Sequence, residues 1–321
     1  MKKTLSNIII PTLDSNAVDI KEFENPKIYN GEIADEKRPP NSPACFQGAW
    51  YRKVYSSKDL WLGIEGTIIL GEFIPDEKRF KSDGRISLKR HLDNPSIYMG
   101  GHALSESDAG LGFNVGYLSD DTSKDLDYGS EKIAYRPFWR YIYEQVYDEN
   151  FQVLRKNINS WNVANAKNLN HYYFPGDKIK MSIYSPIPNY LQLKIDLIEP
   201  TKIEKYKKIR DSFNLSFPIQ NFLSPLFYSK GHGLNFAEFK RVNSIDQFGN
   251  EGFVVSKTNA FVTEAIWEET YLYRRINGEI MKVPMTENRQ TKMACPQSEA
   301  FTIKSFSKTG EKISIHPGII K

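Results

Sequence analysis

The sequence has few of the residues that build metal centres, disulfide frameworks and membrane spans. Two of its 321 residues are cysteines and five are histidines. Cys45 and Cys295 are far apart, which excludes a disulfide scaffold and a zinc site made mainly of thiolates, so we expect two reduced, partly buried thiols. No stretch approaches the roughly 18 apolar residues that a membrane span needs. We therefore expect a soluble protein without a membrane partner.

The charges and the common catalytic motifs narrow the function further. Lysine and arginine number 43 against 39 acidic residues, well mixed along the chain, so no basic stripe predicts a nucleic-acid partner. Neither a Gly-x-x-x-x-Gly-Lys-Ser/Thr loop nor a Gly-x-Ser-x-Gly elbow occurs, and we expect no cofactor. The apolar run at residues 8–10 is too short for a signal-peptide core and ends at Pro11, so a cytoplasmic location is the default expectation.

Alternation of apolar and polar residues is the strongest positive signal. Residues 179–183 and 191–197 both alternate with a period of two, which predicts two half-buried strands. Pro186 and Pro188 lie between them and cannot donate to a β-ladder, so the chain leaves the sheet there and returns as a hairpin partner. Aromatic residues, which favour strands, make up 13% of the chain.

Turn signals predict further hairpins and a single helix. Asn277-Gly278 is the strongest short hairpin signal, Asp83-Gly84 is another, and residues 301–315 form a last hairpin. Residues 203–213 place Ile203, Tyr206, Ile209 and Phe213 on one face of a short helix.

Composition divides the chain into two parts. Residues 1–43 are polar and punctuated by prolines, which predicts an extended arm. Residues 44–321 are predicted to form one β-sandwich with C-terminal hairpins, in which residues 246–321 could be a separate small β subdomain.

Four short segments resemble the eqolisin-type glutamic endopeptidases. They are residues 61–66 (Trp-Leu-Gly-Ile-Glu-Gly), residues 69–73 (Ile-Leu-Gly-Glu-Phe), residues 138–141 (Phe-Trp-Arg-Tyr) and residues 175–177 (Pro-Gly-Asp). The resemblance spans about residues 61–198 and implies a concanavalin A-like sandwich. We therefore expect an all-β fold, an antiparallel β-sandwich of the jelly-roll kind with at most one or two short helices.

The same resemblance implies that the family's catalytic dyad is missing. Gly71 occupies the position that matches the family's glutamine, and Arg140 occupies the position that matches its glutamate. A guanidinium does not give up its proton at ordinary pH and cannot act as a general acid or base. Glu65, Glu72 and Glu144 lie nearby in the sequence and are the remaining candidates for acid–base catalysis.

Exposed aromatic side chains beside carboxylates and amides can bind sugars, because the rings stack on the sugar and the polar groups bond its hydroxyls. The residues that we select for such a site are Trp61, His102, Asp108, Asn114, Trp139, Arg140 and Tyr141. Core packing is the alternative role for the tryptophans and the tyrosine.

One acidic segment has the spacing of a calcium loop. Asp121, Ser123, Asp125 and Asp127 put oxygen atoms on alternate residues. However, Leu126 stands where an EF-hand has glycine, and Lys132 stands where it has the bidentate glutamate, so we favour a solvated acidic loop.

Three functions remain open. The leading hypothesis is a non-catalytic protein that binds a glycan or another extended polymer. The second is a hydrolase that uses carboxylates of the concave sheet, and the third is a structural protein that assembles with copies of itself through the N-terminal arm and its strand edges.

Overall fold

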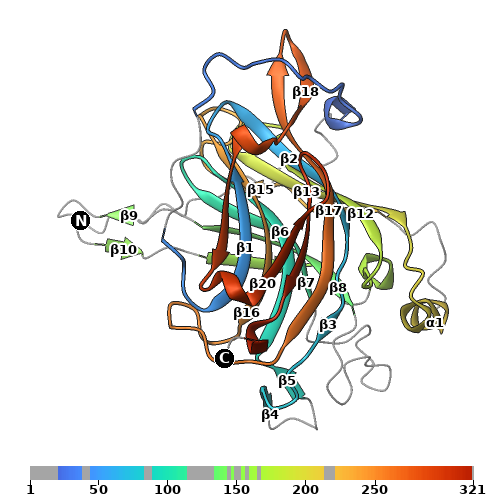
Figure 1. Cartoon of the computed structure of the whole chain (residues 1–321). Coiled ribbons are helices and arrows are strands. Elements are labelled where there is room, and N and C mark those ends of the chain that lie inside the picture. The colour runs from blue at the N-terminus through green and yellow to red at the C-terminus, as the bar shows by residue number, and fades with distance from the viewer. Residues whose placement is uncertain are drawn as a thin grey trace.

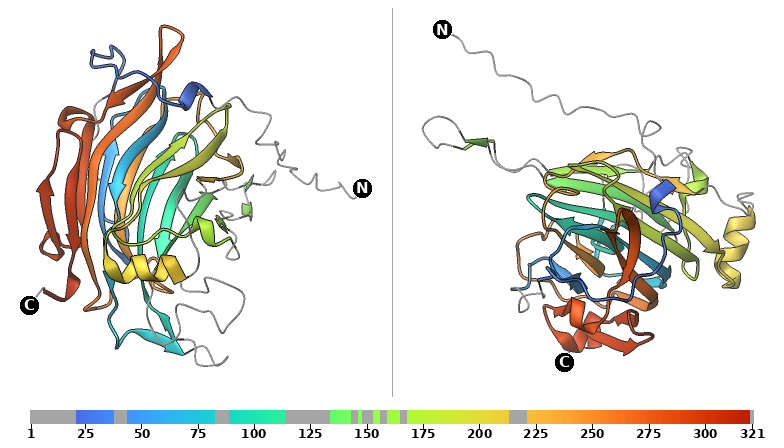
Figure 2. Two further views of the ribbon diagram at one scale, coloured as in Figure 1. Left: turned by 90° about the vertical axis from the view of Figure 1, so that its right-hand side faces the viewer. Right: turned by 90° about the horizontal axis from the view of Figure 1, so that it is seen from above.

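The computed structural model describes residues 21–37, 44–82, 89–113, 134–142, 146–147, 153–155, 159–164, 168–212 and 221–319. Two large antiparallel sheets lie face to face in this part of the chain, so the expected all-β sandwich is confirmed (Figure 1). The single α-helix of the described chain, α1 (Glu204–Ser212), lies at the margin of the larger sheet (Figure 2).

The first sheet has seven strands. In spatial order they are β11 (Asn159–Val163), β8 (Tyr135–Ile142), β7 (Glu106–Phe113), β6 (Asp93–His102), β16 (Glu238–Gln247), β1 (Ala49–Ser56) and β19 (Gln290–Cys295). The pairs β6–β7 and β7–β8 join strands that are neighbours in the sequence, whereas β16, β1 and β19 come from distant segments.

The second sheet has ten strands. Seven follow one path: β14 (Phe222–Leu223), β13 (Tyr190–Glu199), β12 (Lys178–Tyr184), β2 (Trp61–Ile69), β17 (Phe261–Ile276), β21 (Glu311–Ile315) and β20 (Phe301–Ser305). Three lie beside it: β15 (Phe227–Tyr228) on β13, and β18 (Glu279–Pro284) and β3 (Phe73–Ile74) on β17. Strands from residues 246–321 are therefore bonded into both sheets, through β19 to β1 and through β17 to β2.

Short elements complete the described chain. They are the ladders β4 (Phe80–Ser82) with β5 (Lys89–His91) and β9 (Val146–Tyr147) with β10 (Val153–Arg155), and the 3-10 turns η2 (Lys21–Phe23), η4 (Leu169–His171), η5 (Glu287–Arg289), η6 (Ser298–Ala300) and η7 (Pro317–Ile319). No helix of the described residues is long and apolar enough to cross a membrane.

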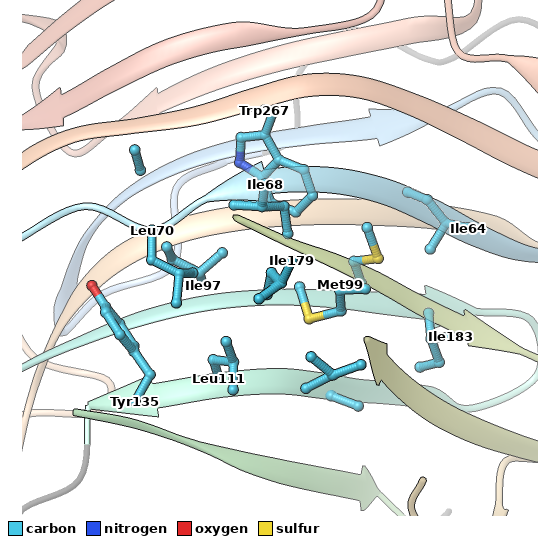
Figure 3. Close-up of a cluster of buried hydrophobic side chains, with 14 of the residues drawn as sticks. Ile64, Ile68, Leu70, Ile97, Met99, Leu111, Tyr135, Ile179, Ile183 and Trp267 are labelled. Carbon is cyan, nitrogen blue, oxygen red and sulfur yellow. The ribbon is translucent and has the colours of Figure 1, made fainter. Parts of the chain in front are cut away.

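The hydrophobic core fills the space between the two sheets (Figure 3). Ile64 and Ile68 of β2 and Ile179 and Ile183 of β12 point into it, as alternation predicts, and all four are fully buried. Gly66 lies between the two isoleucines of β2 because a Cβ there would come within 2.8 Å of the Trp267 ring. The glycine thus makes room for one of the two fully buried tryptophans of the core.

Most of the local predictions are confirmed. β12 and β13 pair as a hairpin around the prolines, β17 and β18 turn at Asn277-Gly278 with positive φ at both residues, and β20 pairs with β21. The helix predicted at 203–213 is α1. It is attached by the buried ion pair of Arg210 with Asp177, 2.6 Å, so the Pro-Gly-Asp segment has a structural role here.

Part of the expected N-terminal arm lies along β18. Tyr29 donates its backbone N–H to Lys282, and the Phe23 ring stacks on Tyr184 with the centroids 4.5 Å apart. None of residues 21–37 is fully buried. This segment therefore contacts its own chain through the surface of the ten-stranded sheet.

The prediction of two reduced thiols is wrong. Cys45 and Cys295 form a disulfide across 250 residues of sequence. The prediction assumed that residues far apart in the sequence are far apart in space. In the fold, β19 lies beside β1, and its register places Cys295 opposite Tyr51, six residues from Cys45. The bond fixes the segment before β1 to the edge strand of the seven-stranded sheet.

Candidate functional site

The surface of the seven-stranded sheet that faces away from the core is the candidate site, and we call it the outer face. It arises from the two-residue period of the strands. On β16, Phe239 and Ile245 point into the core, so Lys240, Val242 and Ser244 point to the outer face.

One row of directly opposite residues crosses this face. From the edge strand β11 to β1 its members are Trp161, Arg140, Asp108, Gly100, Lys240 and Tyr55, and we call them the charged row. Neighbouring strands are about 4.8 Å apart, so five spacings give the row a length of about 24 Å. Tyr55 is buried and the side chains of Asp108 and Lys240 are 13% and 12% exposed, so Trp161 at the edge is the most exposed member of the row.

Lys240 is the electrostatic centre of the charged row. Its ammonium group is 2.8 Å from Asp108 and also bonds Glu106, whose side chain is 43% exposed. The charge of Lys240 lowers the pKa of Glu106 to about 2, against the opposing effect of partial burial. Burial alone would lower the pKa of Lys240, but Asp108 and Glu106 raise it. Lys240 and Glu106 are therefore charged at neutral pH.

Aromatic side chains lie next to the charged row. The Phe138 ring stacks on Trp161, with centroids 4.5 Å apart and an angle of 10° between planes, and meets Tyr98 edge-on at 6.0 Å. Tyr98 and Phe138 are buried, whereas Trp161 is 57% exposed. Gly110 lies between Tyr98 and Phe138, opposite both of them on the neighbouring strands. A Cβ at this position would lie 2.7 Å from the Cβ of Tyr98, so only glycine fits there.

A hydroxyl–carboxylate cluster lies at the other end of the outer face. Ser96 and Ser244 both donate to Asp246, at 2.7 and 2.9 Å, and their own hydroxyls are 2.6 Å apart. Burial raises the pKa of Asp246, and the two serine hydrogen bonds oppose that shift. This carboxyl group therefore takes up a proton more readily than an ordinary aspartate.

Several groups with shifted pKa values lie on the outer face, and others lie in the core and the ten-stranded sheet, such as Tyr135, Asp177 and Tyr273. On the outer face, burial also raises the pKa of Tyr51, Tyr55 and Tyr98 and lowers that of Lys53, whose neighbour Lys240 adds to the effect. Groups with perturbed pKa values gather at functional sites more often than elsewhere, although structural ion pairs also perturb them.

The structure divides the residues that the sequence proposed for ligand binding. His102, Asp108 and Arg140 come together on the outer face, where the His102 side chain is 50% exposed and 4.0 Å from Glu238. Trp61 is fully buried and donates its indole N–H to Ser57. Its ring cannot reach a ligand.

Trp139 and Tyr141 point to the opposite side of β8 from Arg140. They pack on Phe222 and Phe227 of the short strands β14 and β15, at centroid distances of 5.9 and 6.5 Å. Asn114 and the predicted calcium ligands Asp121, Ser123, Asp125 and Asp127 lie outside the described residues. Within the described part of the chain, no three His, Cys, Asp or Glu side chains are grouped to hold a metal ion.

Of the three glutamates considered for catalysis, the two within the described residues have different partners. Glu65 is buried in the ten-stranded sheet, where it accepts hydrogen bonds from Tyr273 and Lys282, each at 2.6 Å. Glu72 accepts a hydrogen bond from Tyr206 of α1 at 2.8 Å. Glu144 lies outside the described residues.

The two positions matched to the eqolisin dyad lie in different sheets. Gly71 lies two residues after β2 of the ten-stranded sheet, and its carbonyl accepts a hydrogen bond from the Tyr135 hydroxyl. Arg140 is on β8 of the seven-stranded sheet, and its side chain is on the outer face.

Sequence reasoning missed Lys240, Glu106, Trp161 and Asp246. The signal was present on β16, where Glu238, Lys240, Ser244 and Asp246 occupy alternate positions of one face. Trp161 had no such signal, because its strand is five residues long.

Comparisons with known proteins give a distant structural similarity. No family model and no curated protein matches the chain. Among solved structures, scytalido-glutamic peptidase with a transition state analog inhibitor is 10% identical, with 84% of this chain and all of that chain covered and a TM-score of 0.46. SCP-B, a member of the eqolisin family of peptidases in a complex with the tripeptide Ala-Ile-His, is 8% identical over 83% of this chain and 98% of that chain, with a TM-score of 0.40.

The two antiparallel sheets define the class of the protein, an antiparallel β-sandwich. Its structural neighbours are eqolisin peptidases, but identities of 8–10% and TM-scores of 0.40–0.46 carry no argument about activity.

Proposed function

We propose that this protein is a non-catalytic binding protein that holds an extended glycan, or a polymer of similar chemistry, on the outer face. The charged row is the observation that carries the proposal. It places an exposed tryptophan, an arginine and an ion-paired aspartate opposite one another on three neighbouring strands. A sugar ring can stack on Trp161 while its hydroxyls bond Arg140 and Asp108.

The carboxylates of the outer face favour binding over hydrolysis. Glycosidases use two carboxyl groups about 5–10 Å apart, one of them protonated. Glu106 and Asp108 share one ammonium group, and the pKa of Glu106 is too low for it to carry a proton near neutral pH. Asp246 is six residues from Lys240 along β16, which corresponds to about 20 Å. It is too far away to complete a pair with them.

Isothermal titration against a panel of soluble oligosaccharides and peptides tests the proposal. We expect at least one saccharide to bind, and Trp161→Ala to weaken its binding at least tenfold. Phe253→Ala is the matched control, because Phe253 is 66% exposed and lies in the loop after β16. The proposal fails if no saccharide binds, or if both variants bind as the wild type does.

A second candidate, an acid hydrolase, is favoured by Asp246. A carboxyl group with a raised pKa beside two hydroxyls is a typical arrangement for proton transfer. If the protein is an acid hydrolase, it should cleave peptide or glycan substrates in mildly acidic solution. Asp246→Asn should then remove the activity, and Glu251→Gln, a change at an exposed acid nearby, should leave it unchanged. An activity panel from pH 3 to 7 that stays flat for the wild type eliminates this candidate.

The disulfide indicates where the protein works. Disulfides form and persist in oxidising compartments and are rare in the cytosol. We propose that the chain functions outside the cytosol, in place of the cytoplasmic default. Mass spectrometry of the native protein with and without prior reduction tests this, since thiols that alkylate without reduction contradict it.

A further inference from the structure

Two tyrosines lie side by side on the ten-stranded sheet, on its surface away from the core. Tyr184 of β12 and Tyr273 of β17 are both opposite Gly63 of β2, and their rings meet edge-on with centroids 6.4 Å apart. Their neighbours Ile183 and Leu272 point into the core, so the two rings point away from it. We call them the tyrosine pair. It lies on a different sheet from the outer face.

Phe23 of the N-terminal arm packs against both rings. It stacks on Tyr184 at 4.5 Å, with 22° between the planes, and meets Tyr273 edge-on at 5.4 Å. Both tyrosines are 1% exposed, whereas Phe23 itself is only partly buried. The tyrosine pair is therefore a surface that accepts an aromatic side chain.

Basic residues of the sheet bind the acids on either side of this phenylalanine. Arg275 donates to Glu22 at 2.6 Å, and Lys194 lies 3.9 Å from Glu24 and 3.6 Å from Asp196 of its own strand. Glu22 and Glu24 are 55% and 50% exposed, so each ion pair contributes little free energy. Such pairs select a partner by its charge pattern, which here is acid–aromatic–acid.

The arm then continues as an added strand along β18 (Figure 1). The amide of Tyr29 donates to the Lys282 carbonyl, and the Lys282 amide donates to the Lys27 carbonyl, both at 2.8 Å. Ile28 and Lys282 thus form a parallel bridge. A peptide that adds to the edge of a sheet gains affinity from such main-chain bonds and specificity from its side chains.

The arm is anchored more firmly at its other end. Glu36 pairs with Arg289 at 2.9 Å, with the two side chains 12% and 10% exposed, and Lys37 exchanges both backbone bonds with Lys58. Residues 22–29 are held by one ring, exposed ion pairs and two backbone bonds. Local opening takes the least stable part of a fold first, so this segment leaves the sheet more readily than its anchor does.

We infer that the tyrosine pair, with Arg275 and Lys194, is a docking site for a segment of another protein that carries an aromatic residue between two acidic ones and then extends along β18. Residues 22–29 occupy this site as an internal competitor. A tethered segment acts at an effective concentration on the order of millimolar, so it lowers the apparent affinity of a partner without preventing binding. The site is independent of the saccharide binding proposed for the outer face.

Fluorescence anisotropy with a labelled peptide of residues 20–30 tests the inference on the full chain. The wild type should bind this peptide weakly, because its own arm competes. Phe23→Ala in the protein removes the ring of the competitor and should strengthen peptide binding at least tenfold. Phe306→Ala, at a phenylalanine that is 45% exposed between β20 and β21, is the matched control and should leave binding unchanged.

An exchange of charges identifies the site. In the Phe23→Ala protein, Arg275→Glu with Lys194→Glu should weaken peptide binding at least tenfold. A peptide with lysine in place of each of the two glutamates should bind this variant at least tenfold more tightly than the original peptide does. Lys304→Glu with Lys308→Glu, at two exposed lysines of the C-terminal hairpin, makes the same change of charge elsewhere and should have no effect.

Thermal melting shows that each variant is folded. The inference is overturned if the Phe23→Ala protein binds the peptide no better than the wild type does, or if the peptide with exchanged charges does not recover binding. Light scattering that shows a wild-type dimer which Phe23→Ala dissociates also overturns it, because the site would then receive the arm of a second copy.

Discussion

Lys240 and Arg241 are neighbours on β16 and point to opposite faces of the sheet. Inside, Arg241 and Arg52 share Glu311 of β21, at 2.9 and 2.8 Å, so this cluster joins the two sheets. Outside, Lys240 shares Glu106 and Asp108, both of β7. We call these the inner and the outer ion clusters.

The two clusters show that similar ion pairs have different consequences on the two faces of a strand. The inner cluster is buried, so its charges depend entirely on one another. The outer cluster has a partner side chain that is 43% exposed and can exchange protein contacts for water or a ligand. We therefore expect substitutions inside to affect stability and substitutions outside to affect binding.

Glu311→Gln should have the largest effect. It leaves two buried guanidinium groups without a counter-charge, and breaking a buried ion pair costs about 3–5 kcal/mol. Urea unfolding at pH 7 measures the loss. A loss below about 1 kcal/mol would mean that the inner cluster does not hold the sheets together.

Removal of the disulfide by Cys45→Ser with Cys295→Ser should cost about 2–5 kcal/mol, because the bond closes a loop of 250 residues in the unfolded chain. The same urea experiment measures it, with the reduced wild type as the control. Cys295 lies in the apolar cluster of the outer face, so this variant shows how much that face depends on its covalent edge.

Because the imidazole of His232 is buried, we expect the folded protein to lose stability in acid. Burial lowers its pKa to about 4, and Ser229 Oγ lies 2.8 Å from its Nδ1. The unfolded chain binds a proton near pH 6.5 and the folded chain only near pH 4, so stability is complete above pH 6.5 and falls as the pH drops to 4. The difference corresponds to about 3 kcal/mol.

Urea midpoints between pH 4 and 7 test this expectation. In the His232→Gln variant, the urea midpoint should change less with pH between 4 and 7. The His102→Gln variant, changed at an exposed position, should show the same pH dependence as the wild type. If the wild type is equally stable at pH 4.5 and 7, the buried imidazole does not control acid stability.

Glu106→Gln should have the smallest effect on stability, below about 1 kcal/mol, because the Glu106 side chain is 43% exposed and Lys240 keeps Asp108 as a partner at 2.8 Å. The variant should still weaken binding of any saccharide that the wild type binds, since it removes a carboxylate beside the charged row. If Glu106→Gln is as destabilising as Glu311→Gln, the distinction between the two clusters is lost.

The sequence predicted the local elements well because their signals are local. Alternation identified β12 and β13, and Asn277-Gly278 identified the β17–β18 turn. A resemblance of four short segments also indicated the sandwich. Each of these signals lies within a few residues of the structure it predicts.

The site was predicted only in part because it depends on strand register. Asp108 and Arg140 are 32 residues apart and become neighbours only when β7 pairs with β8. Trp61 and Trp161 have the same chemistry, and only the direction of each side chain from its strand places one in the core and leaves the other exposed.

The bond between Cys45 and Cys295 makes most of the polypeptide a closed ring. A protease that cuts once anywhere inside this ring leaves the two pieces attached, and they migrate as one species on a gel until a reductant is added. Nicked molecules could therefore keep both layers of the sandwich associated, and the protein would tolerate damage to its loops that would separate an uncrosslinked chain.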